Sequence, residues 1–190
     1  MTIRPERESE FPAIYSLIKT AFETAKVKDG DEQDFAEQLR KGNSYIPELA
    51  LVVEKDGELI AHIMLTRASV TTSAGSFEGL LLAPVSVLLQ HRNQGVGTKL
   101  ITEAMERAKT MGFKAVFLAG DRNYYSRFGF VPARRYGIRL AQELPDDLID
   151  NIMACELVPN ALEHVSGILD FGCDHELDVD AIQQAMTTGE

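Results

Sequence analysis

The chain has no tryptophan and only two cysteines, Cys155 and Cys173, among its 190 residues. A chain of this length can bury a sizeable core without a disulfide, so the simplest interpretation is two reduced thiols in a cytoplasmic protein. The two nearby histidines, His164 and His175, do not complete a spacing that is typical of zinc ligands. We therefore expect neither a structural disulfide nor a metal cofactor.

Long apolar runs are also missing. The longest extends from Gly79 to Leu89 and is interrupted by Pro84 and Ser86, which makes it too short to span a bilayer. The first eight residues contain no apolar stretch of the kind that a signal peptide requires. We therefore expect no membrane span and no signal peptide.

Positive charge is scarce, because 19 Lys and Arg residues face 29 Asp and Glu residues, for a net charge of −10 at pH 7. Nucleic acids and anionic membranes bind clustered basic residues, so both are excluded as general partners. An acidic surface suits an amine partner, although solubility alone also accounts for it. One local group of arginines can meet an anionic ligand, and its members are Arg122, Arg127, Arg134, Arg135 and Arg139.

The first third of the chain changes from a helical to a strand-like pattern. Apolar residues recur at three- and four-residue steps over Ser9–Phe22, which predicts an amphipathic helix with Ser9 as its N-cap. A second, shorter helix is expected over Asp34–Lys41. The dipeptide Asp56-Gly57 then predicts a hairpin turn. The strands expected around and after this turn cover residues 48–54, 58–70 and 77–89.

Pro84 lies inside the third of these strands. Proline cannot donate to a strand ladder, so we expect a bulge, a splay or an unpaired edge at this point. Gly95–Met111 carries one apolar stripe and predicts the clearest helix of the chain. A short strand over Lys114–Ala119 and a short helix over Tyr124–Phe128, closed by Gly129, complete the pattern.

The order of these elements predicts an α/β protein with a mixed sheet. We expect residues 1–140 to form the core domain and residues 141–190 to form an extension that packs on it. Within the extension the pattern is weaker and is compatible with a strand over 149–158 and a short helix over 160–165.

The strongest local feature is the segment from Val87 to Thr98, in which a buried strand ends, a short turn follows and a long helix begins at two glycines. The first N–H groups of a helix have no intrahelical partner and lie at the positive end of its dipole, so they form an anion site. Gly95 and Gly97 let a pyrophosphate approach the backbone, and Arg92 can add positive charge. Neither a dinucleotide fingerprint nor a Walker A loop fits the order of residues. Alone, the segment is equally compatible with a packed turn.

A second segment, one strand later, makes the interpretation specific. Arg92–Gly97 matches the Q/R-x-x-G-x-G/A signature of the GNAT superfamily of N-acetyltransferases, and Tyr125–Phe130 matches its Tyr-x-x-x-Gly-Phe segment. Leu82–Val87 and Gly120–Phe130 also resemble the YhbS-like branch of that superfamily. The resemblance covers about Ile3–Arg135 in the order of elements, and its specific motifs lie between Leu82 and Phe130.

The resemblance implies a GNAT-like fold, with a central mixed, mostly antiparallel sheet that is splayed at the cofactor strand and flanked by helices. It also implies an acyl-CoA-dependent N-acetyltransferase, with acetyl-CoA as acyl donor and a small-molecule or protein amine as acceptor. In this family the pantetheine arm lies in the gap of the splayed sheet as a pseudo-strand. A homodimer is compatible with the sequence, although no residue demands one.

The resemblance also assigns functional residues at the matching positions. The backbone of Val87, Leu88 and Leu89 would line the acyl end of the cofactor, and the N–H of Val87 or Leu88 would polarise the thioester carbonyl. Tyr125 matches the tyrosine that protonates the departing CoA thiolate. The N–H groups that would hold the pyrophosphate are those of Arg92, Asn93, Gln94, Gly95, Val96, Gly97 and Thr98.

The sequence departs from the family pattern at several points. Leu89 stands where the family usually has proline, and Ala83 stands where the YhbS-like pattern usually has glycine. The asparagine that often precedes the tyrosine helix is not at its usual distance, and either Asp121 or Asn123 can replace it.

The general base is the role that the motifs leave open. Glu78, at the start of the cofactor strand, and His62, on the preceding strand, are the candidates, and the sequence favours Glu78. A carboxylate at a strand edge is more often merely solvated, and a histidine in an apolar run is more often packed and hydrogen-bonded. Direct attack needs no base when the amine arrives neutral.

Two other classes of function fit the same motifs. One is a GNAT-like module that binds acyl-CoA without turnover, and the other is a nucleotide-binding regulatory domain that needs a phosphate site but no acyl tunnel. Replacing Tyr125 by Phe separates the enzyme from the first class. Competition by CoA, but not by ATP or NAD, separates it from the second.

Overall fold

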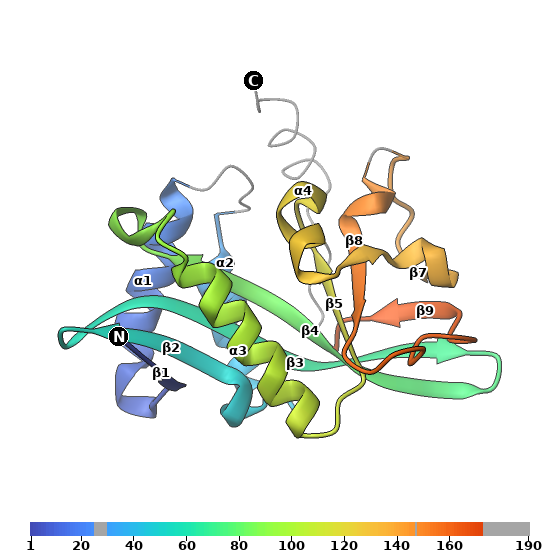
Figure 1. Ribbon diagram of the computed structural model, residues 1–190, viewed down its shortest axis with the longest axis horizontal. Coiled ribbons are helices and arrows are strands. Elements are labelled where there is room, and N and C mark those ends of the chain that lie inside the picture. The colour runs from blue at the N-terminus through green and yellow to red at the C-terminus, as the bar shows by residue number, and fades with distance from the viewer. Residues whose placement is uncertain (25–29, 147, 173–190) are drawn as a thin grey trace.

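The computed structural model describes residues 1–24, 30–146 and 148–172. This part of the chain forms a nine-stranded sheet with helices on both faces (Figure 1), which confirms the predicted α/β class. The strands are β1 (Thr2–Pro5), β2 (Ala50–Lys55), β3 (Glu58–Thr72), β4 (Gly75–Val87), β5 (Ala115–Ala119), β6 (Val131–Pro132), β7 (Ile138–Leu140), β8 (Ile152–Glu156) and β9 (Gly167–Asp170).

In the described part of the chain, four α-helices and six short 3₁₀ turns connect these strands. The α-helices are α1 (Phe11–Glu23), α2 (Glu32–Lys41), α3 (Val96–Thr110) and α4 (Arg122–Tyr125). The 3₁₀ turns are η1 (Glu8–Glu10), η2 (Pro47–Leu49), η3 (Leu89–His91), η4 (Ser126–Phe128), η5 (Ala133–Tyr136) and η6 (Ile149–Asn151). Within the described residues no helix is both long and apolar enough to cross a bilayer.

The sheet is mixed and mostly antiparallel, as predicted. Its strands follow the order β1-β2-β3-β4-β5-β8-β6, while β9 pairs with the far part of β3 and β7 pairs with β9. The pairs β4–β5 and β7–β9 are parallel, and the other pairs are antiparallel. The described part of the C-terminal extension supplies β8 and β9, so it takes part in the sheet directly.

The helices divide the core between the two faces of the sheet. On one face α3 packs Leu100, Ile101 and Ala104 against a large apolar cluster that includes Leu51, Ile63 and other strand residues. On the opposite face α1 and α2 pack around Val52 and Met64. Neighbouring residues of β2 and β3 therefore serve different cores, because successive side chains of a strand point to opposite faces.

The β4 strand contains a bulge and separates from β5 along part of its length. Ile63 of β3 lies opposite Val85, while Leu65 lies opposite Leu82, so Ala83 and Pro84 form a bulge. The parallel pairing of β4 with β5 covers only Leu80 and Leu81. Beyond Leu81 the two strands separate, which confirms the splay predicted from Pro84.

The structure corrects three local expectations. Ser9 lies in η1 and not at a helix N-cap, because the Glu10 carboxylate accepts the Arg7 N–H at 3.0 Å and α1 begins only at Phe11. Residues 160–165 form successive turns instead of a helix, since Asn160 and His164 adopt positive φ values of 63° and 69°. The first part of the strand expected over 149–158 is the turn η6.

Candidate active site

The predicted phosphate-binding segment connects β4 to α3 through η3. Gly95 caps α3 with a left-handed φ of 77°, a conformation that glycine adopts without strain. The first α-helical bond runs from the Lys99 N–H to the Gly95 carbonyl at 3.0 Å, so the N–H groups of Val96, Gly97 and Thr98 precede the hydrogen-bonded ladder. These three groups are the ones that the helix start offers to an anion.

Gly97 is held where a side chain would not fit well. A Cβ at this position would lie 3.0 Å from the Tyr124 hydroxyl and 3.6 Å from a Val87 methyl group. The end of β4, the start of α3 and α4 therefore meet at Gly97. No local pattern predicts this contact, because Tyr124 and Gly97 are 27 positions apart.

The register of β3 and β4 gives the N–H groups of Val87 and Leu88 different directions. The Leu88 N–H donates to the Ile60 carbonyl at 3.0 Å and is therefore used inside the protein. Backbone groups alternate in direction along an antiparallel strand, so the N–H of Val87 points to the other edge of β4. That is the edge from which β5 has separated, and Val87 is the donor that faces the gap.

Arg92 occupies a different place from the one expected. Its Nε donates to the Val87 carbonyl at 3.0 Å, one Nη donates to the Thr24 carbonyl at 3.2 Å, and the other donates to the Ala21 carbonyl. Its backbone N–H is also engaged, by the Leu89 carbonyl at 3.2 Å. The guanidinium thus caps the last carbonyls of α1 and ties that helix to the end of β4.

Tyr125 lies in α4, whose start is capped by the Asp121 carboxylate accepting the Asn123 N–H at 2.8 Å. Its ring packs on Gly120, where a Cβ would come within 2.7 Å of it, and meets the Phe130 ring edge-on at 5.9 Å. Burial raises the pKa of Tyr125 above its usual value, so the phenol is protonated at neutral pH. Tyr125 and Val87 pack against the same apolar cluster beneath α3.

Glu78 is not brought to these residues. Its side chain is 60% exposed and forms an ion pair with Arg67, whose guanidinium lies 5.5 Å from the Phe113 ring, beyond the C-terminal end of α3. The phosphate-binding segment lies at the other end of α3, which is about 22 Å long by its 15 residues. Glu78 also precedes the paired residues Leu80 and Leu81, whereas the gap begins after them.

His62 lies in a buried polar cluster on the face that α1 and α2 cover. Its Nε2 is 2.9 Å from the Glu6 carboxylate, and its other ring nitrogen has no hydrogen-bond partner among the described residues. No local sequence signal predicts this contact, because Glu6 and His62 are 56 positions apart.

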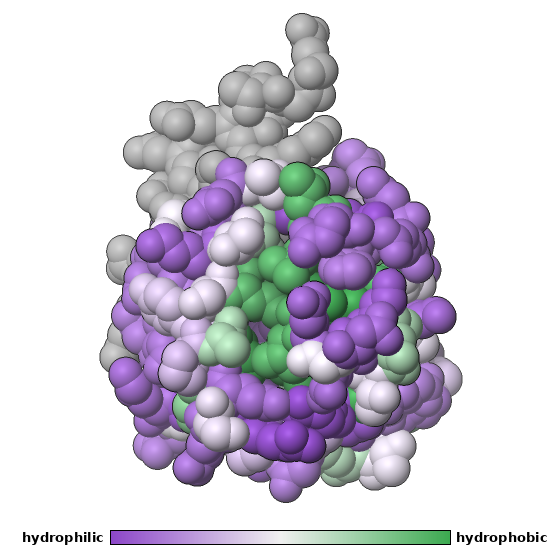
Figure 2. Space-filling model, turned by 90° about the vertical axis from the view of Figure 1, so that its left-hand side faces the viewer, coloured by the Kyte–Doolittle hydropathy of each residue, from purple (hydrophilic) through white to green (hydrophobic). Residues whose placement is uncertain are grey.

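The side of the molecule that carries the β4–α3 turn has an open, apolar area. Figure 2 shows an apolar hollow, ringed by polar residues, on the side of the molecule where the β4–α3 turn lies. Leu89, which replaces the family's usual proline, is 59% exposed in that turn. A separate cavity of about 390 Å³, lined by Met105, Phe128 and Cys155 among others, includes none of the predicted site residues.

Three arginines of the predicted basic group contact neighbouring side chains. Arg122 and Arg134 share the Asp150 carboxylate, while Arg127 lies over the Tyr124 ring at 4.0 Å from its centre. Within the described residues no group of three or more His, Cys, Asp or Glu side chains is arranged to hold a metal ion. Cys173 and His175 lie outside the described residues.

A family model described as an acetyltransferase (GNAT) domain matches residues 2–133 of the chain. The uncharacterized N-acetyltransferase YjhQ of Escherichia coli K12 is 35% identical over 101 residues, which are 53% of this chain and 56% of YjhQ. The uncharacterized N-acetyltransferase YhbS of the same strain is 25% identical over 171 residues, which are 90% of this chain and 96% of YhbS.

Solved structures with the same fold include proteins bound to CoA. The E. coli YhbS structure in complex with CoA superposes with a TM-score of 0.77 at 25% identity and covers 88% of this chain and 87% of that one. A GNAT family acetyltransferase from Brucella melitensis in complex with acetyl-CoA has a TM-score of 0.70 at 24% identity, covers 89% of this chain and 94% of that one, and supports the fold.

Proposed function

Because the chain belongs to the acetyltransferase (GNAT) domain family, we propose that it transfers an acetyl group from acetyl-CoA to the nitrogen of an amine acceptor. The observation that carries the proposal is the Val87 N–H, which faces the gap between β4 and β5 and lies next to the start of α3. YhbS and the Brucella protein, which share the fold, were crystallised with CoA and acetyl-CoA respectively.

The cofactor would lie along this gap. Its pyrophosphate would accept from the N–H groups at the start of α3, with the Thr98 hydroxyl nearby, and the remaining groups of the 92–98 segment would shape the turn. Its pantetheine arm would run along the free edge of β4 as an added strand. The Val87 N–H would then donate to the thioester carbonyl and stabilise the negative charge that develops on its oxygen.

The chemical step is direct attack. The amine nitrogen bonds to the carbonyl carbon, the C–S bond breaks, and the departing thiolate takes a proton from the Tyr125 hydroxyl. Because burial raises the pKa of Tyr125, its hydroxyl still carries the proton when the thiolate departs. Glu78 has the least support among the predicted roles, because it lies apart from the gap.

The acceptor in this proposal is an amine on a small molecule or a protein. The net charge of −10 favours a cationic acceptor over an anionic one. A cytoplasmic location, where acetyl-CoA and reduced thiols coexist, is part of the same proposal.

Calorimetry with acetyl-CoA, CoA, ATP and NAD tests the cofactor, and CoA release with a library of amines tests the reaction. We expect an acetyl-CoA Kd of about a micromolar and no binding of ATP or NAD. Binding without CoA release from any amine would favour the alternative, a non-catalytic module that binds acyl-CoA.

A further inference from the structure

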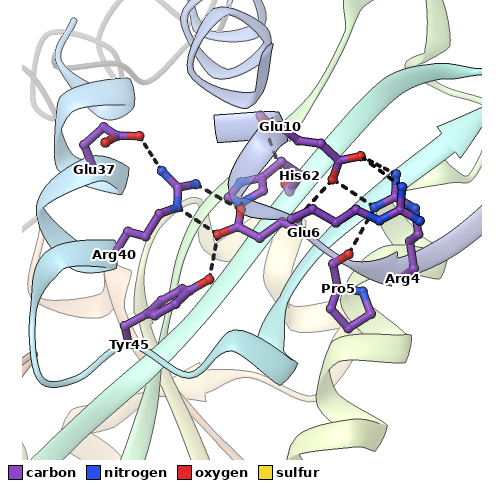
Figure 3. Close-up of polar contacts among 10 residues, drawn as sticks. Arg4, Pro5, Glu6, Glu10, Glu37, Arg40, Tyr45 and His62 are labelled. Atoms are coloured by element: carbon purple, nitrogen blue, oxygen red, sulfur yellow. Dashed lines mark hydrogen bonds and ion pairs between the residues drawn. The ribbon is translucent and has the colours of Figure 1, made fainter. Parts of the chain in front are cut away.

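His62 and Glu6 form a buried acid–base pair that the reaction described above does not use. His62 is fully buried on β3, and its Nε2 lies 2.9 Å from the Glu6 carboxylate, which is itself 1% exposed (Figure 3). Arg40 donates to the same carboxylate at 2.8 and 2.9 Å, and the Tyr45 hydroxyl donates at 2.9 Å. Burial raises the pKa of Glu6, but the hydrogen bonds from His62 and Arg40 outweigh it and lower that pKa to about 2.

These contacts fix the position of the histidine proton. An ionised carboxylate only accepts hydrogen bonds, so Nε2 of His62 carries the proton and Nδ1 presents a lone pair. Nδ1 is buried and has no hydrogen-bond partner among the described residues. Burial lowers the pKa of His62, so the ring is neutral at pH 7 and ready to accept a proton at Nδ1.

The residue opposite His62 lies on the cofactor strand. His62 pairs in register with Ser86 of β4, so the two side chains project from the same face of the sheet. The Ser86 hydroxyl is buried and makes only a 3.5 Å contact with the His62 carbonyl, at the limit of a hydrogen bond. A proton relay through these two residues requires this hydroxyl to turn from the carbonyl to Nδ1, the ring nitrogen that has no other partner among the described residues.

Ser86 and the proposed acid, Tyr125, lie on opposite faces of the sheet. Ser86 lies between Val85 and Val87, whose side chains pack on the α3 face with Tyr125, whereas its own side chain projects to the opposite face. The acid and the serine thus flank the free edge of β4 from opposite faces. Acyl transfer needs a base near the attacking nitrogen and an acid near the departing sulfur, and two groups on opposite faces of the strand can serve these separate atoms.

Resting on the function proposed above, we propose that Ser86, His62 and Glu6 form a proton relay that serves as the general base for the acceptor amine. As the C–N bond forms and the C–S bond breaks, the amine proton passes to Ser86 Oγ while the hydroxyl proton passes to His62 Nδ1. The Glu6 carboxylate stabilises the resulting imidazolium, and Tyr125 protonates the thiolate. Return of a proton from His62 to the Tyr125 phenolate through solvent restores both groups.

The first test uses the full chain without an acceptor. Nitrogen NMR of ¹⁵N-histidine-labelled protein at pH 7 should show His62 as neutral, protonated at Nε2, and Ser86→Ala should shift its Nδ1 resonance. A proton on Nδ1, or a cationic ring at pH 7, would overturn the relay. The charged and titratable groups around the ring are Glu6, Arg40 and Tyr45, with Glu37 paired to Arg40.

The second test is kinetic and uses the variants Ser86→Ala and His62→Gln. The matched control is Thr66→Val, which removes a different buried hydroxyl, on β3. With an alkylamine, which loses one proton to solvent before it attacks, we expect kcat to fall by about 10² or more in the first two variants and to hold in the control. With hydroxylamine, whose less basic nitrogen gives up its remaining proton more readily once it is bonded to carbon, the loss should be much smaller. The wild-type pH profile should lose its acidic limb in His62→Gln.

The outcomes separate the relay from the proposed function. Absence of acetyl-CoA binding to the wild-type protein contradicts the proposed function itself, whereas full turnover by Ser86→Ala, with acetyl-CoA affinity unchanged, overturns only the relay. A loss in Glu78→Gln with none in Ser86→Ala would likewise overturn it and return the base to Glu78. Where no probe amine is acetylated, hydrolysis of acetyl-CoA by water, followed as thiol release, gives the same comparison. Ser86→Ala serves as the decisive variant if His62→Gln fails to fold.

Discussion

The Nε of Arg92 donates to the carbonyl oxygen of Val87 at 3.0 Å, so the arginine that begins the phosphate-binding signature is attached to the strand that precedes it. The two remaining guanidinium nitrogens donate to Ala21 and Thr24 at the end of α1. Because its guanidinium donates to three backbone carbonyls, the main role of Arg92 is to hold the backbone of the site in position and not to supply charge to a ligand. It fixes the last peptide of β4, next to the amide that would meet the thioester.

This assignment predicts that charge alone will not replace Arg92. In Arg92→Lys the ammonium keeps the charge but cannot reach three carbonyls on two segments, so acetyl-CoA affinity should fall about tenfold, nearly as far as in Arg92→Ala. Calorimetry measures the effect, with Arg139→Lys as the matched control, since the Arg139 side chain makes one 3.4 Å contact with a neighbouring carbonyl. Wild-type affinity in Arg92→Lys would show instead that the charge binds the pyrophosphate.

Removal of the Tyr125 hydroxyl should separate binding from chemistry. Tyr125→Phe keeps the ring packed on Gly120 and Phe130 but removes the proton donor, so kcat should fall by about 10² while the Kd for acetyl-CoA changes less than about twofold. Stopped assays of CoA release and calorimetry give the two quantities. Tyr136→Phe is the control hydroxyl deletion, and equal turnover by the two variants would remove Tyr125 from the mechanism.

The sequence predicted the local features of this molecule well because each has a short-range physical cause. The helix expected over Gly95–Met111 is observed as Val96–Thr110, with Gly95 and Gly112 in left-handed conformations at its ends. The Asp56-Gly57 hairpin is confirmed by two successive positive φ values, and Pro84 does break the ladder of β4. Proline and glycine act through their own backbone, so these effects are visible in sequence.

Contacts between distant segments could not be predicted in the same way. The sequence ranked Glu78 above His62 as base, since a carboxylate near the cofactor strand is visible and the partner of a buried histidine is not. Only the fold brings Glu6, which follows β1, and Arg40 of α2 to His62. Likewise, no pattern indicates that the Arg92 side chain turns to α1, 71 positions earlier.

Gly97 offers a test of the phosphate site that does not involve charge. In Gly97→Ala the added methyl group would lie 3.0 Å from the Tyr124 hydroxyl, on the side of α3 that meets β4. The ring can move by a few tenths of an ångström, so the fold should persist with about 1 kcal/mol lost, while acetyl-CoA affinity should fall about tenfold or more. Thermal unfolding and calorimetry measure the two effects. Gly42→Ala is the control, because its φ of −81° suits a side chain and an added Cβ would lie no closer than 3.4 Å to its neighbours, an ordinary van der Waals contact. Unchanged affinity in Gly97→Ala would show that the cofactor does not approach there.

The buried pair also predicts how stability depends on pH. The folded-state pKa of Glu6 is lowered from 4.5 to about 2, so its contribution is present above pH 4.5 and is lost as the pH falls towards 2. The pKa of His62 is lowered from 6.5, so below that pH the unfolded chain binds a proton that the folded protein does not. Both effects have the same sign, and the free energy of unfolding should decrease on acidification from pH 6.5 downwards.

The size of the loss in unfolding free energy at acid pH tests whether Glu6 causes it. A shift of this magnitude at a side chain that is 1% exposed corresponds to about 3 kcal/mol lost between pH 4.5 and 2. Urea unfolding at a series of pH values should show this loss in the wild-type protein and a much shallower slope in Glu6→Gln, which is less stable at pH 7 but has no carboxylate to titrate. The Arg4–Glu10 pair, where the pKa of Glu10 is also lowered, contributes to both proteins and cancels in the comparison. Parallel slopes in the two proteins would mean that Glu6 is not held ionised, and the orientation of His62 by a carboxylate would then be wrong as well.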